Sequence, residues 1–197
     1  MTVVKCDGQP AYTSDIAFEF RYRAVVTLAD ESRGLTCSVA VASKHFRGLA
    51  RELRGFPSFE AAAAEVVGGR ADALLVPAAY PEIRRFFFDS ALTATESFVA
   101  ELPDMVLVAS GAQPLDRYAR LYHHPATQQL LSELPFDFAE AVPVSSNTAA
   151  GAALDEDAEP ALAITNRLVA DHHGLRPLRV LAAGEAMAFI IFERSSS

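Results

Sequence analysis

LLVPAAYPEIRRFFF, residues 74–88, is the stretch that decides how the rest of the chain is interpreted. Its apolar run stops at Pro77, and two alanines lead to Tyr80, two arginines and three phenylalanines. A buried strand that gives way to such a segment predicts the lip of a ligand cleft, because ligands of open α/β sheets bind beyond the carboxyl ends of the strands. A core strand followed by an amphipathic helix explains the same pattern, so periodicity alone leaves both interpretations open.

The composition narrows the class of protein. The 197 residues are enough for one domain or two small lobes with a core. A formal net charge of -8 argues against nucleic acid and anionic membranes as partners. Cys6 and Cys37 are too few for a disulfide framework, so we expect free thiols in a reducing compartment. The sequence shows neither a signal peptide nor an apolar run of spanning length, and we therefore expect a cytoplasmic protein.

The basic residues leave an anionic small molecule open as ligand. Lys5 and Lys44 are the only lysines among the 17 basic residues, and the others are arginines, whose planar guanidinium suits carboxylates. With so few lysines, pyridoxal chemistry through a Schiff base is not expected. The sequence also has no phosphate loop and no Gly-x-Gly-x-x-Gly motif.

The N-terminal half predicts a parallel βαβ arrangement. Alternation from Phe18 to Val26 predicts a strand, and apolar spacing predicts a helix from Ser38 through Leu53 with Lys44, Arg47 and Arg51 facing away. Ser58 is expected to open a second helix that ends at Gly68-Gly69, and residues 73–76 to form the next strand. Residues 1–13 are expected to be an extension and residues 30–34 a turn.

The remainder continues the α/β pattern. Strands are expected at residues 97–101, 105–109, 121–123, 141–144, 161–164, 180–181 and 189–192. Helices are expected after Pro125, after Ser146 and from Asn166 to His173. The predicted division is lobe one at residues 1–79, lobe two at 80–177, and a return to lobe one at 178–197.

Three expected helix starts carry small polar residues. They are Thr36 with Ser38, Thr127 behind His124-Pro125, and Ser146-Asn147-Thr148. If they converge, their backbone N–H groups would hold a carboxylate. Capping alone also explains each of them.

The histidine pairs do not predict a metal site. His123-His124 and His172-His173 are adjacent pairs, and neighbours on a strand point to opposite faces, so one such pair cannot chelate. Cysteine or acidic partners at ligand spacing are missing as well. There is also no Gly-x-Ser-x-Gly nucleophile elbow.

Several segments of the C-terminal two-thirds together resemble the prephenate dehydratase superfamily. The matching segments are Val76-Pro77-Ala78-Ala79-Tyr80 with Ile83 and Phe86, His124-Pro125, Ser146-Asn147-Thr148-Ala149-Ala150, and Ala163-Ile164-Thr165-Asn166 running to Gly174-Leu175. The resemblance is strongest to the small stand-alone branch, the non-aromatising prephenate decarboxylases of bacilysin-type pathways. It implies a two-lobed α/β fold of the type II periplasmic-binding-protein kind, with an inter-lobe cleft that binds the dianion prephenate without a cofactor or metal.

Departures from the dehydratases favour the decarboxylase branch. Dehydratases carry a Thr-Arg-Phe near the end whose threonine assists loss of the ring hydroxyl, and the corresponding strand is Met187-Ala188-Phe189. Their Glu-Asn-Ser is replaced by Ala78-Ala79-Tyr80. The resemblance therefore implies a lyase that decarboxylates prephenate without aromatisation, for antibiotic biosynthesis. One further departure, Gly34-Leu35-Thr36-Cys37-Ser38 in place of Gly-Pro-Glu-Gly-Thr, leaves drift of the substrate open.

The resemblance and the pattern together give a set of expected site residues. Asn147 and Thr148 are expected to hold the pyruvyl carboxylate with Arg84 or Arg85. The ring carboxylate would lie against apolar side chains, namely Phe86, Phe88 and Met187. Tyr80 or His124 would hold the proton donor or position a water. The other expected substrate contacts are Thr36, Ser38, Ala79, Ala149, Thr165 and Asn166.

Two other functions stay open at this point. A dehydratase would produce phenylpyruvate from prephenate, and a non-catalytic binding protein would use the same cleft for capture alone. The sequence also leaves open whether the chain forms a homodimer.

Overall fold

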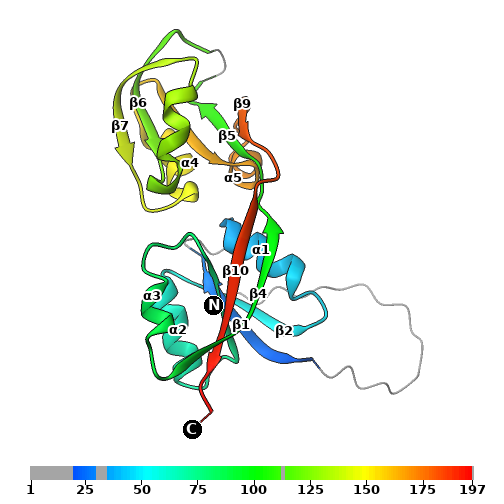
Figure 1. Ribbon diagram of the computed structural model, residues 1–197. Coiled ribbons are helices and arrows are strands. Elements are labelled where there is room, and N and C mark those ends of the chain that lie inside the picture. The colour runs from blue at the N-terminus through cyan, green and yellow to red at the C-terminus, as the bar shows by residue number, and fades with distance from the viewer. Residues whose placement is uncertain (1–19, 30–34, 112–113, 197) are drawn as a thin grey trace, which may run out of the picture.

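The computed structural model describes residues 20–29, 35–111 and 114–196. Predictions for the extension at residues 1–13, the turn at 30–34, the alternation before Phe20 and Cys6 lie outside these ranges. The described residues form two lobes, each built on its own five-stranded sheet (Figure 1). The two-lobed α/β fold predicted from the sequence is confirmed.

Lobe one has the strand order β2-β1-β3-β10-β4. Its strands are β1 Tyr22–Leu28, β2 Ala50–Phe56, β3 Ala73–Pro77, β4 Leu92–Glu101 and β10 Ala186–Arg194. Its helices are α1 Cys37–His45, α2 Phe59–Val67 and α3 Arg84–Phe87. Strands β1, β2 and β3 run parallel, and β10 pairs antiparallel with β3 and β4.

Lobe two has the strand order β7-β6-β8-β5-β9. Its strands are β5 Met105–Ala109, β6 Arg117–His123, β7 Asp137–Pro143, β8 Ala161–Asn166 and β9 Pro177–Ala182. Its helices are the 3-10 helix η1 Pro125–Glu133, α4 Asn147–Glu156 and α5 Arg167–His172. Strand β6 runs parallel to β7 and β8, while β5 is antiparallel to β8 and β9.

Each sheet is covered on both faces, which explains why the central strands are continuous apolar runs. In β3, Leu74 and Val76 pack toward α2, and Ala73 and Leu75 pack on the opposite face with α1. In lobe two, Leu107 and its neighbours face η1, while the alternate residues of the same strands face α4 and α5. The pattern of residues 74–76 therefore marks a core strand, as predicted.

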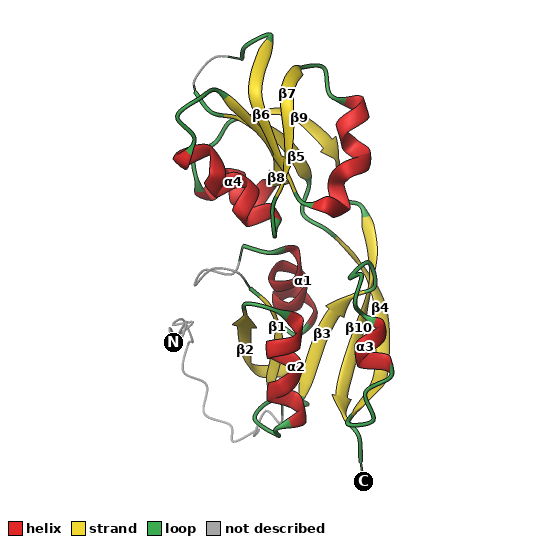
Figure 2. Ribbon diagram, turned by 90° about the vertical axis from the view of Figure 1, so that its left-hand side faces the viewer, coloured by secondary structure: helices red, strands yellow, loops and turns green. Residues whose placement is uncertain are grey.

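Two short segments join the lobes. Leu102–Asp104 leads from β4 into β5, and Ala183–Glu185 leads from β9 into β10, so two strands cross between the bodies (Figure 2). The segments are bonded to each other, since Leu102 N donates to Glu185 O at 2.9 Å and Gly184 N to Asp104 Oδ1 at 3.2 Å. Two short connections that lie side by side and run in opposite directions form a hinge geometry.

The sheets place the lobe boundaries differently from the predicted 79/80 and 177/178. Helix α3 and strand β4 belong to lobe one, because β4 pairs with β10, and β9 belongs to lobe two, because it pairs with β5. The chain therefore passes from one lobe to the other at the two hinge segments. The predicted boundary at 79/80 was placed just after Pro77, but Pro77 ends strand β3 and the chain then continues in lobe one.

Two predicted helices are corrected. The helix expected from Ser38 through Leu53 ends at His45, and residues 50–56 form strand β2. Gly48, with φ of 75°, turns the chain, and β2 then pairs with β1, which the helical spacing could not reveal. The helix after Pro125 is a 3-10 helix. The helix opened by Ser58 and the stop at Gly174 are confirmed.

Within the described ranges, none of the helices combines the length and the apolar character needed to cross a lipid bilayer.

Candidate functional site

The carboxyl ends of the parallel strands in both lobes point at the gap between them. In lobe one, β1, β2 and β3 lead into α1, α2 and the loop before α3; in lobe two, β6, β7 and β8 lead into η1, α4 and α5. Since Asn166 at the end of β8 pairs with Met105 at the hinge end of β5, this edge of lobe two faces lobe one. Figure 2 shows α1 at the end of lobe one that lies nearest to lobe two. Ligand sites in α/β sheets lie at such edges.

The helix starts at this edge are capped by small polar side chains. Thr36 Oγ1 accepts from Val39 N at 3.2 Å and donates to Leu28 O at 2.8 Å, which ties the start of α1 to the end of β1. Ser146 Oγ accepts from Ala149 N at 2.9 Å at the start of α4. These bonds satisfy one amide in each first turn, and the amides of the first two residues have no intrahelical acceptor.

The starts of α1, α4 and α5 meet across the lobes. The side-chain amide of Asn166 donates to Leu35 O at 3.0 Å and lies 3.9 Å from Cys37 Sγ. Burial raises the pKa of the Cys37 thiol, and hydrogen bonds from the Asn147 and Asn166 side chains partly offset that rise. We call residues 35–38 of lobe one together with 146–148 and Asn166 of lobe two the inter-lobe junction. Of the three helix starts whose convergence the sequence left open, those of α1 and α4 meet here.

The α4 side of the junction is fixed by Thr165. Its fully buried hydroxyl donates to Asn147 O at 2.5 Å, so Thr165 supports the position of Asn147 through the backbone. Gly151, one turn into α4, allows α4 to approach α5, because a Cβ there would lie 2.4 Å from Val169 Cγ1. The start of α4 is therefore held by packing that admits little change.

Two polar atoms of the junction are buried without a partner among the described residues. They are Asn147 Oδ1 and Thr148 Oγ1, and Thr148 as a whole is only 1% exposed. A buried polar atom that lacks a hydrogen bond costs about 1–3 kcal/mol. These atoms are thus suited to partners that a ligand supplies: the amide oxygen to a donor, and the hydroxyl to either a donor or an acceptor.

Tyr80 is engaged within lobe one. Its hydroxyl donates to Glu60 Oε1 at 2.7 Å, and its ring packs on Phe59 and Phe86 with centroids 4.7 and 6.2 Å away. Burial, reinforced by the bond to Glu60, raises the pKa of Tyr80 to about 12. Burial opposes ionisation of Glu60, but the bond from Tyr80 and neighbouring groups leave the pKa of Glu60 lowered. Tyr80 therefore keeps its proton, shared with a carboxylate.

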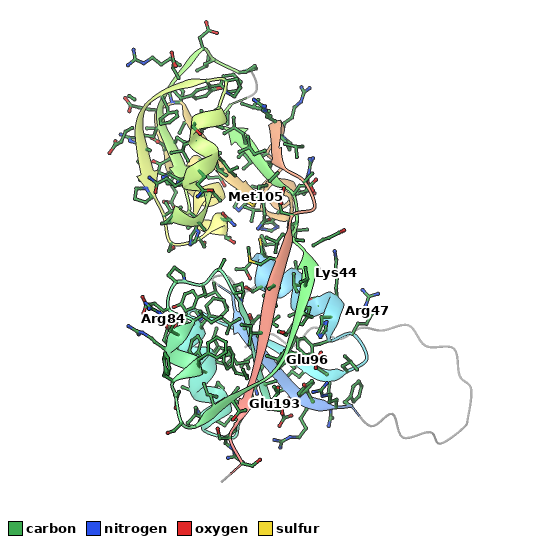
Figure 3. All side chains as sticks on the ribbon, viewed as in Figure 1. Lys44, Arg47, Arg84, Glu96, Met105 and Glu193 are labelled. Carbon is green, nitrogen blue, oxygen red and sulfur yellow. The ribbon has the colours of Figure 1, made fainter. Side chains whose placement is uncertain are left out.

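The other lobe-one candidates are dispersed. Arg84 is exposed and points away from the molecule (Figure 3), and exposed Arg85 bonds to Glu82 at 2.9 Å. Phe86 is buried in the core of lobe one beside α2, whereas Phe88 is 85% exposed. Ala79 lies exposed in the loop before α3. The structure does not bring these side chains to the junction.

Met187 lies near the hinge end of β10, half-buried on the face that α1 covers. It pairs with Ala100 of β4, and the next residue, Ala188, accepts from Ala78 N at 2.8 Å. This contact brings the Met187 strand beside the loop that follows β3. A thioether at this place offers no proton to a ligand.

His124 and Thr127 shape the start of η1. His124 Nδ1 accepts from Ala126 N at 3.2 Å, and the carbonyl of His124 accepts from Thr127 Oγ1 at 2.8 Å. An acceptor role for Nδ1 places the proton of the neutral ring on Nε2. Thr127 is thus bonded within its own helix start, and these contacts do not bring it to the other two starts.

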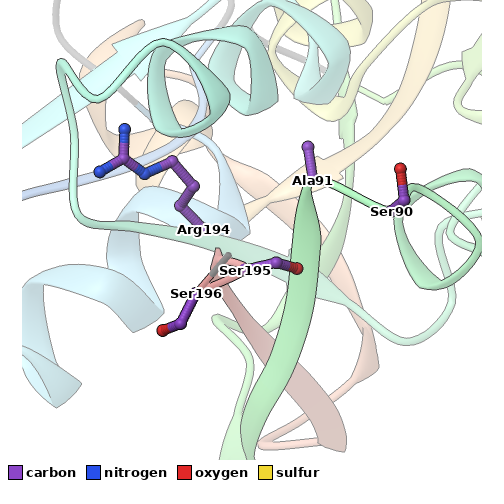
Figure 4. Close-up of a pocket in the computed structure, with 5 residues that line it drawn as sticks. All are labelled: Ser90, Ala91, Arg194, Ser195 and Ser196. Atoms are coloured by element: carbon purple, nitrogen blue, oxygen red, sulfur yellow. The ribbon is translucent and has the colours of Figure 1, made fainter.

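Two surface hollows lie away from the junction. One, of about 440 Å³, is lined by Ser90, Ala91, Arg194, Ser195 and Ser196 at the end of β10 that is opposite the hinge (Figure 4). The other, of about 350 Å³, lies between α1 and β4 and includes Lys44 and Phe98. Neither includes a residue of the junction, and the first is an open corner between a strand start and the chain end.

The sequence missed several features of the junction. Cys37 and the carbonyl of Leu35 were not expected at the site, because the contacts that make them relevant come from Asn166, 129 and 131 positions away. Asn166 was expected to touch substrate, and its cap on α5 could be inferred from its place before a helix, but its second partner could not. Glu60, which accepts the bond from Tyr80, was not expected at the site.

The two-lobed fold is shared with proteins of several functions. No family model matches the sequence, and no curated protein matches it at a significant level. The structure is similar to that of a prephenate dehydratase from Arthrobacter aurescens in complex with L-Phe, with a TM-score of 0.65 and 21% identity over 88% of this chain and 61% of that one.

Two further solved structures extend the comparison. GqqA, described as a novel type of quorum-quenching acylase, has a TM-score of 0.62 and 18% identity, covering 89% of this chain and 65% of GqqA. The methionine-binding protein MetQ has a TM-score of 0.54 and 17% identity, covering 89% of this chain and 84% of MetQ. The chain therefore spans less than two thirds of the dehydratase and of GqqA, and the likeness at these identities is one of fold.

Proposed function

We propose that the inter-lobe junction binds prephenate and that the protein is a lyase that decarboxylates it without aromatisation and without a cofactor, for antibiotic biosynthesis. The observation that carries the proposal is the meeting of the starts of α1 and α4 at two orphaned polar atoms, Asn147 Oδ1 and Thr148 Oγ1. The sequence resemblance to the decarboxylase branch and the fold shared with a prephenate dehydratase agree with it.

The junction suits a ligand that carries both carboxylates and a hydroxyl. Backbone amides of Ser38, Asn147 and Thr148 belong to first turns of helices, where an anion is favoured by free N–H groups and by the helix dipoles. The Thr148 hydroxyl can donate to a carboxylate, and Asn147 Oδ1 can accept from a hydroxyl. Prephenate carries two carboxylates and a ring hydroxyl.

Arginine is not assigned a role in this proposal. The outward direction of Arg84 and the pairing of Arg85 with Glu82 place both guanidinium groups on the surface of α3. Helix starts and hydroxyl groups hold carboxylates without a formal positive charge.

The surroundings favour loss of carbon dioxide over loss of water. In decarboxylation, the bond between the ring and its carboxylate breaks, the electron pair enters the diene, and a proton adds to a distal ring carbon, so the hydroxyl stays. Dehydration would need an acid directed at the ring hydroxyl, where this proposal places Asn147 Oδ1, an atom that can only accept. Tyr80 already donates to Glu60, and Met187 has no proton to give. We assign the positioning of the incoming proton, or of a water that carries it, to His124 Nε2.

The experiment is incubation of the full chain with prephenate, followed by mass spectrometry and proton NMR of the product. The expected product is a non-aromatic dihydro-4-hydroxyphenylpyruvate together with carbon dioxide. A blank without protein corrects for spontaneous aromatisation in acid. Phenylpyruvate above the blank would assign a dehydratase, and saturable binding without turnover would assign a binding protein; either result overturns the proposal.

A further inference from the structure

The side chain of Asn166 forms hydrogen bonds to both lobes at the junction, one through its amide oxygen and one through its amide nitrogen. Its Oδ1 accepts from Val169 N at 2.9 Å and caps α5, while its Nδ2 donates to Leu35 O at 3.0 Å in lobe one. The residue is fully buried; its bond to Val169 N is buried as well, and its bond to Leu35 O is partly buried. A side chain that only capped α5 would need an oxygen alone, which Ser or Asp supplies equally well. The amide nitrogen serves the contact between the lobes.

The bond between the lobes lies close to the hinge. Asn166 pairs with Met105, the first residue after the hinge segment Leu102–Asp104, and Arg167 N donates to Asp104 O at 2.8 Å. Asn166 is therefore fixed relative to the hinge, whereas Leu35 moves with lobe one. A rotation about the hinge that opens the lobes lengthens the bond from Asn166 to Leu35.

The same contact covers a thiol. Cys37, the first residue of α1, is partly buried, with Asn166 Nδ2 at 3.9 Å from its sulfur and the Asn147 amide also bonded to it. Separation of the lobes at this point would expose Cys37. Its reactivity is thus a measure of how often the junction opens.

We propose that Asn166 is a positioning residue, which holds the start of α1 against lobe two and so sets the closed form of the junction. The inference rests on the proposed function in one respect: the amides positioned in this way are those assigned to hold the ligand. Loss of the bond shifts the lobes toward the open form, by an amount set by the net contribution of one buried hydrogen bond, which corresponds to about tenfold in the equilibrium.

The test measures labelling of Cys37 by an aromatic disulfide reagent in protein without ligand. A Cys6→Ser background leaves one thiol. Asn166→Asp keeps the capping oxygen for Val169 N but replaces the donor by an oxygen that repels Leu35 O. We expect Cys37 to react about tenfold faster in this variant. Asn166→Ser, which keeps a capping hydroxyl and loses the amide, should react faster in the same way and serves if Asn166→Asp does not fold.

Asn147→Asp is the control for the added charge. It also loses its amide bond to the Cys37 sulfur, but it keeps the bond from Asn166 to Leu35. Both aspartate variants place a carboxylate beside the thiol, which raises the pKa of the thiol and slows its reaction when exposure is unchanged. Faster labelling in Asn166→Asp but not in Asn147→Asp therefore reports opening of the junction. An unchanged rate in both Asn166 variants, or an equal rise in Asn147→Asp, overturns the inference.

Turnover supplies a second readout that separates this inference from the proposed function. With prephenate, Asn166→Asp should raise KM about tenfold and lower kcat less, because the closed form must be assembled at each binding event. If the parent protein leaves prephenate unchanged, the proposed function fails while the labelling result still decides the role of Asn166. If turnover is normal and labelling is insensitive to Asn166, the inference fails alone.

Discussion

The ends of β3 and β8, the central strands of the two lobes, face each other across the gap and are built in different ways. Strand β3 ends at Pro77 and leads to Tyr80, whose hydroxyl is bonded to Glu60 in a cluster of aromatic rings. Strand β8 ends at Thr165-Asn166, buried polar residues whose bonds reach α4 in lobe two and Leu35 in lobe one. The polar groups at the end of β3 are satisfied within their lobe, whereas those at the end of β8 build the junction.

This difference suggests that lobe two holds the ligand and that lobe one covers it. The orphaned atoms Asn147 Oδ1 and Thr148 Oγ1 both belong to lobe two. Lobe one contributes the start of α1. Matched substitutions in the two lobes test this division, because each destabilises its lobe by a similar amount while only the lobe-two change should disturb turnover.

The largest effect is expected from crowding of the two close approaches at glycine. Gly151→Ala would place a Cβ 2.4 Å from Val169 Cγ1, and Gly55→Ala would place one 2.2 Å from Ala29 Cβ in lobe one. Overpacking of this kind costs about 1–3 kcal/mol, so both variants should lose stability in urea titrations. Only Gly151→Ala displaces α4, and its kcat/KM for prephenate should fall by about tenfold or more.

The control removes the crowded contact between residue 151 and Val169. Val169→Ala removes Cγ1, and the double variant Gly151→Ala with Val169→Ala should recover part of both stability and turnover. Equal losses of turnover in Gly151→Ala and Gly55→Ala would mean that the two lobes contribute alike, which contradicts the comparison.

A pair of buried threonines gives the next effect. Thr165 Oγ1 donates to Asn147 O at 2.5 Å, and Thr27 Oγ1 in lobe one donates to Leu75 O at 2.9 Å; both side chains are fully buried. Replacement by Val should cost about 1 kcal/mol of stability in each case, since one net hydrogen bond is lost. Turnover should fall severalfold in Thr165→Val and stay unchanged in Thr27→Val, as steady-state kinetics with prephenate would show.

The sequence predicted strands and helices correctly where the local residue pattern agreed with the tertiary packing. The apolar run Leu74-Leu75-Val76 is a strand in the core of its lobe, and Ser58, Ser146 and Asn166 cap helices where their positions before apolar runs predicted it. It failed at residues 46–56, where helical spacing continues through a turn and into β2. Pairing with β1 decides that segment, and pairing is not encoded locally.

The site was predictable to a smaller extent. The polar residues at the start of α4 were identified, because helix starts have a sequence signature. Tyr80 was expected at the cleft, yet its hydroxyl is bonded to Glu60, 20 positions earlier. The contact of Asn166 with Leu35 depends on how the lobes meet at the hinge. Such contacts follow from tertiary geometry, and a motif cannot supply them.

Acid pH should lower the stability of each lobe, because each contains an aspartate whose carboxylate accepts several hydrogen bonds. In lobe one, hydrogen bonds from Arg23 and Ala24 to Asp72 outweigh burial and lower its pKa; in lobe two, Arg120 lowers the pKa of Asp157. Because both folded pKa values lie below the unfolded value of about 3.9, the stabilisation is complete above that pH and is lost as pH falls through the folded values. Urea midpoints measured from pH 6 downward should show this loss.

Substitution by asparagine identifies the lobe responsible. Asp72→Asn should reduce the acid dependence of protection in β1, and Asp157→Asn that in β6, as read by hydrogen exchange of the corresponding peptides. Arg23 is exposed, and solvent screens its ion pair with Asp72. We therefore expect Asp72→Asn to change the acid dependence of lobe one only modestly. If either variant keeps the full acid dependence in its own lobe, that aspartate is not its origin.

The smallest effect on turnover is expected from Tyr80→Phe. The hydroxyl of Tyr80 belongs to lobe one through Glu60, and with a pKa of about 12 it stays protonated throughout the neutral range. Its loss should cost about 0.5–1.5 kcal/mol of stability and leave kcat within about twofold of the parent. If Tyr80 instead delivered the proton, kcat would fall by about 100-fold or more, since general-acid catalysis contributes that much. A large loss of kcat at unchanged stability would therefore move the proton donor from lobe two to lobe one and reverse the division of roles between the ends of β3 and β8.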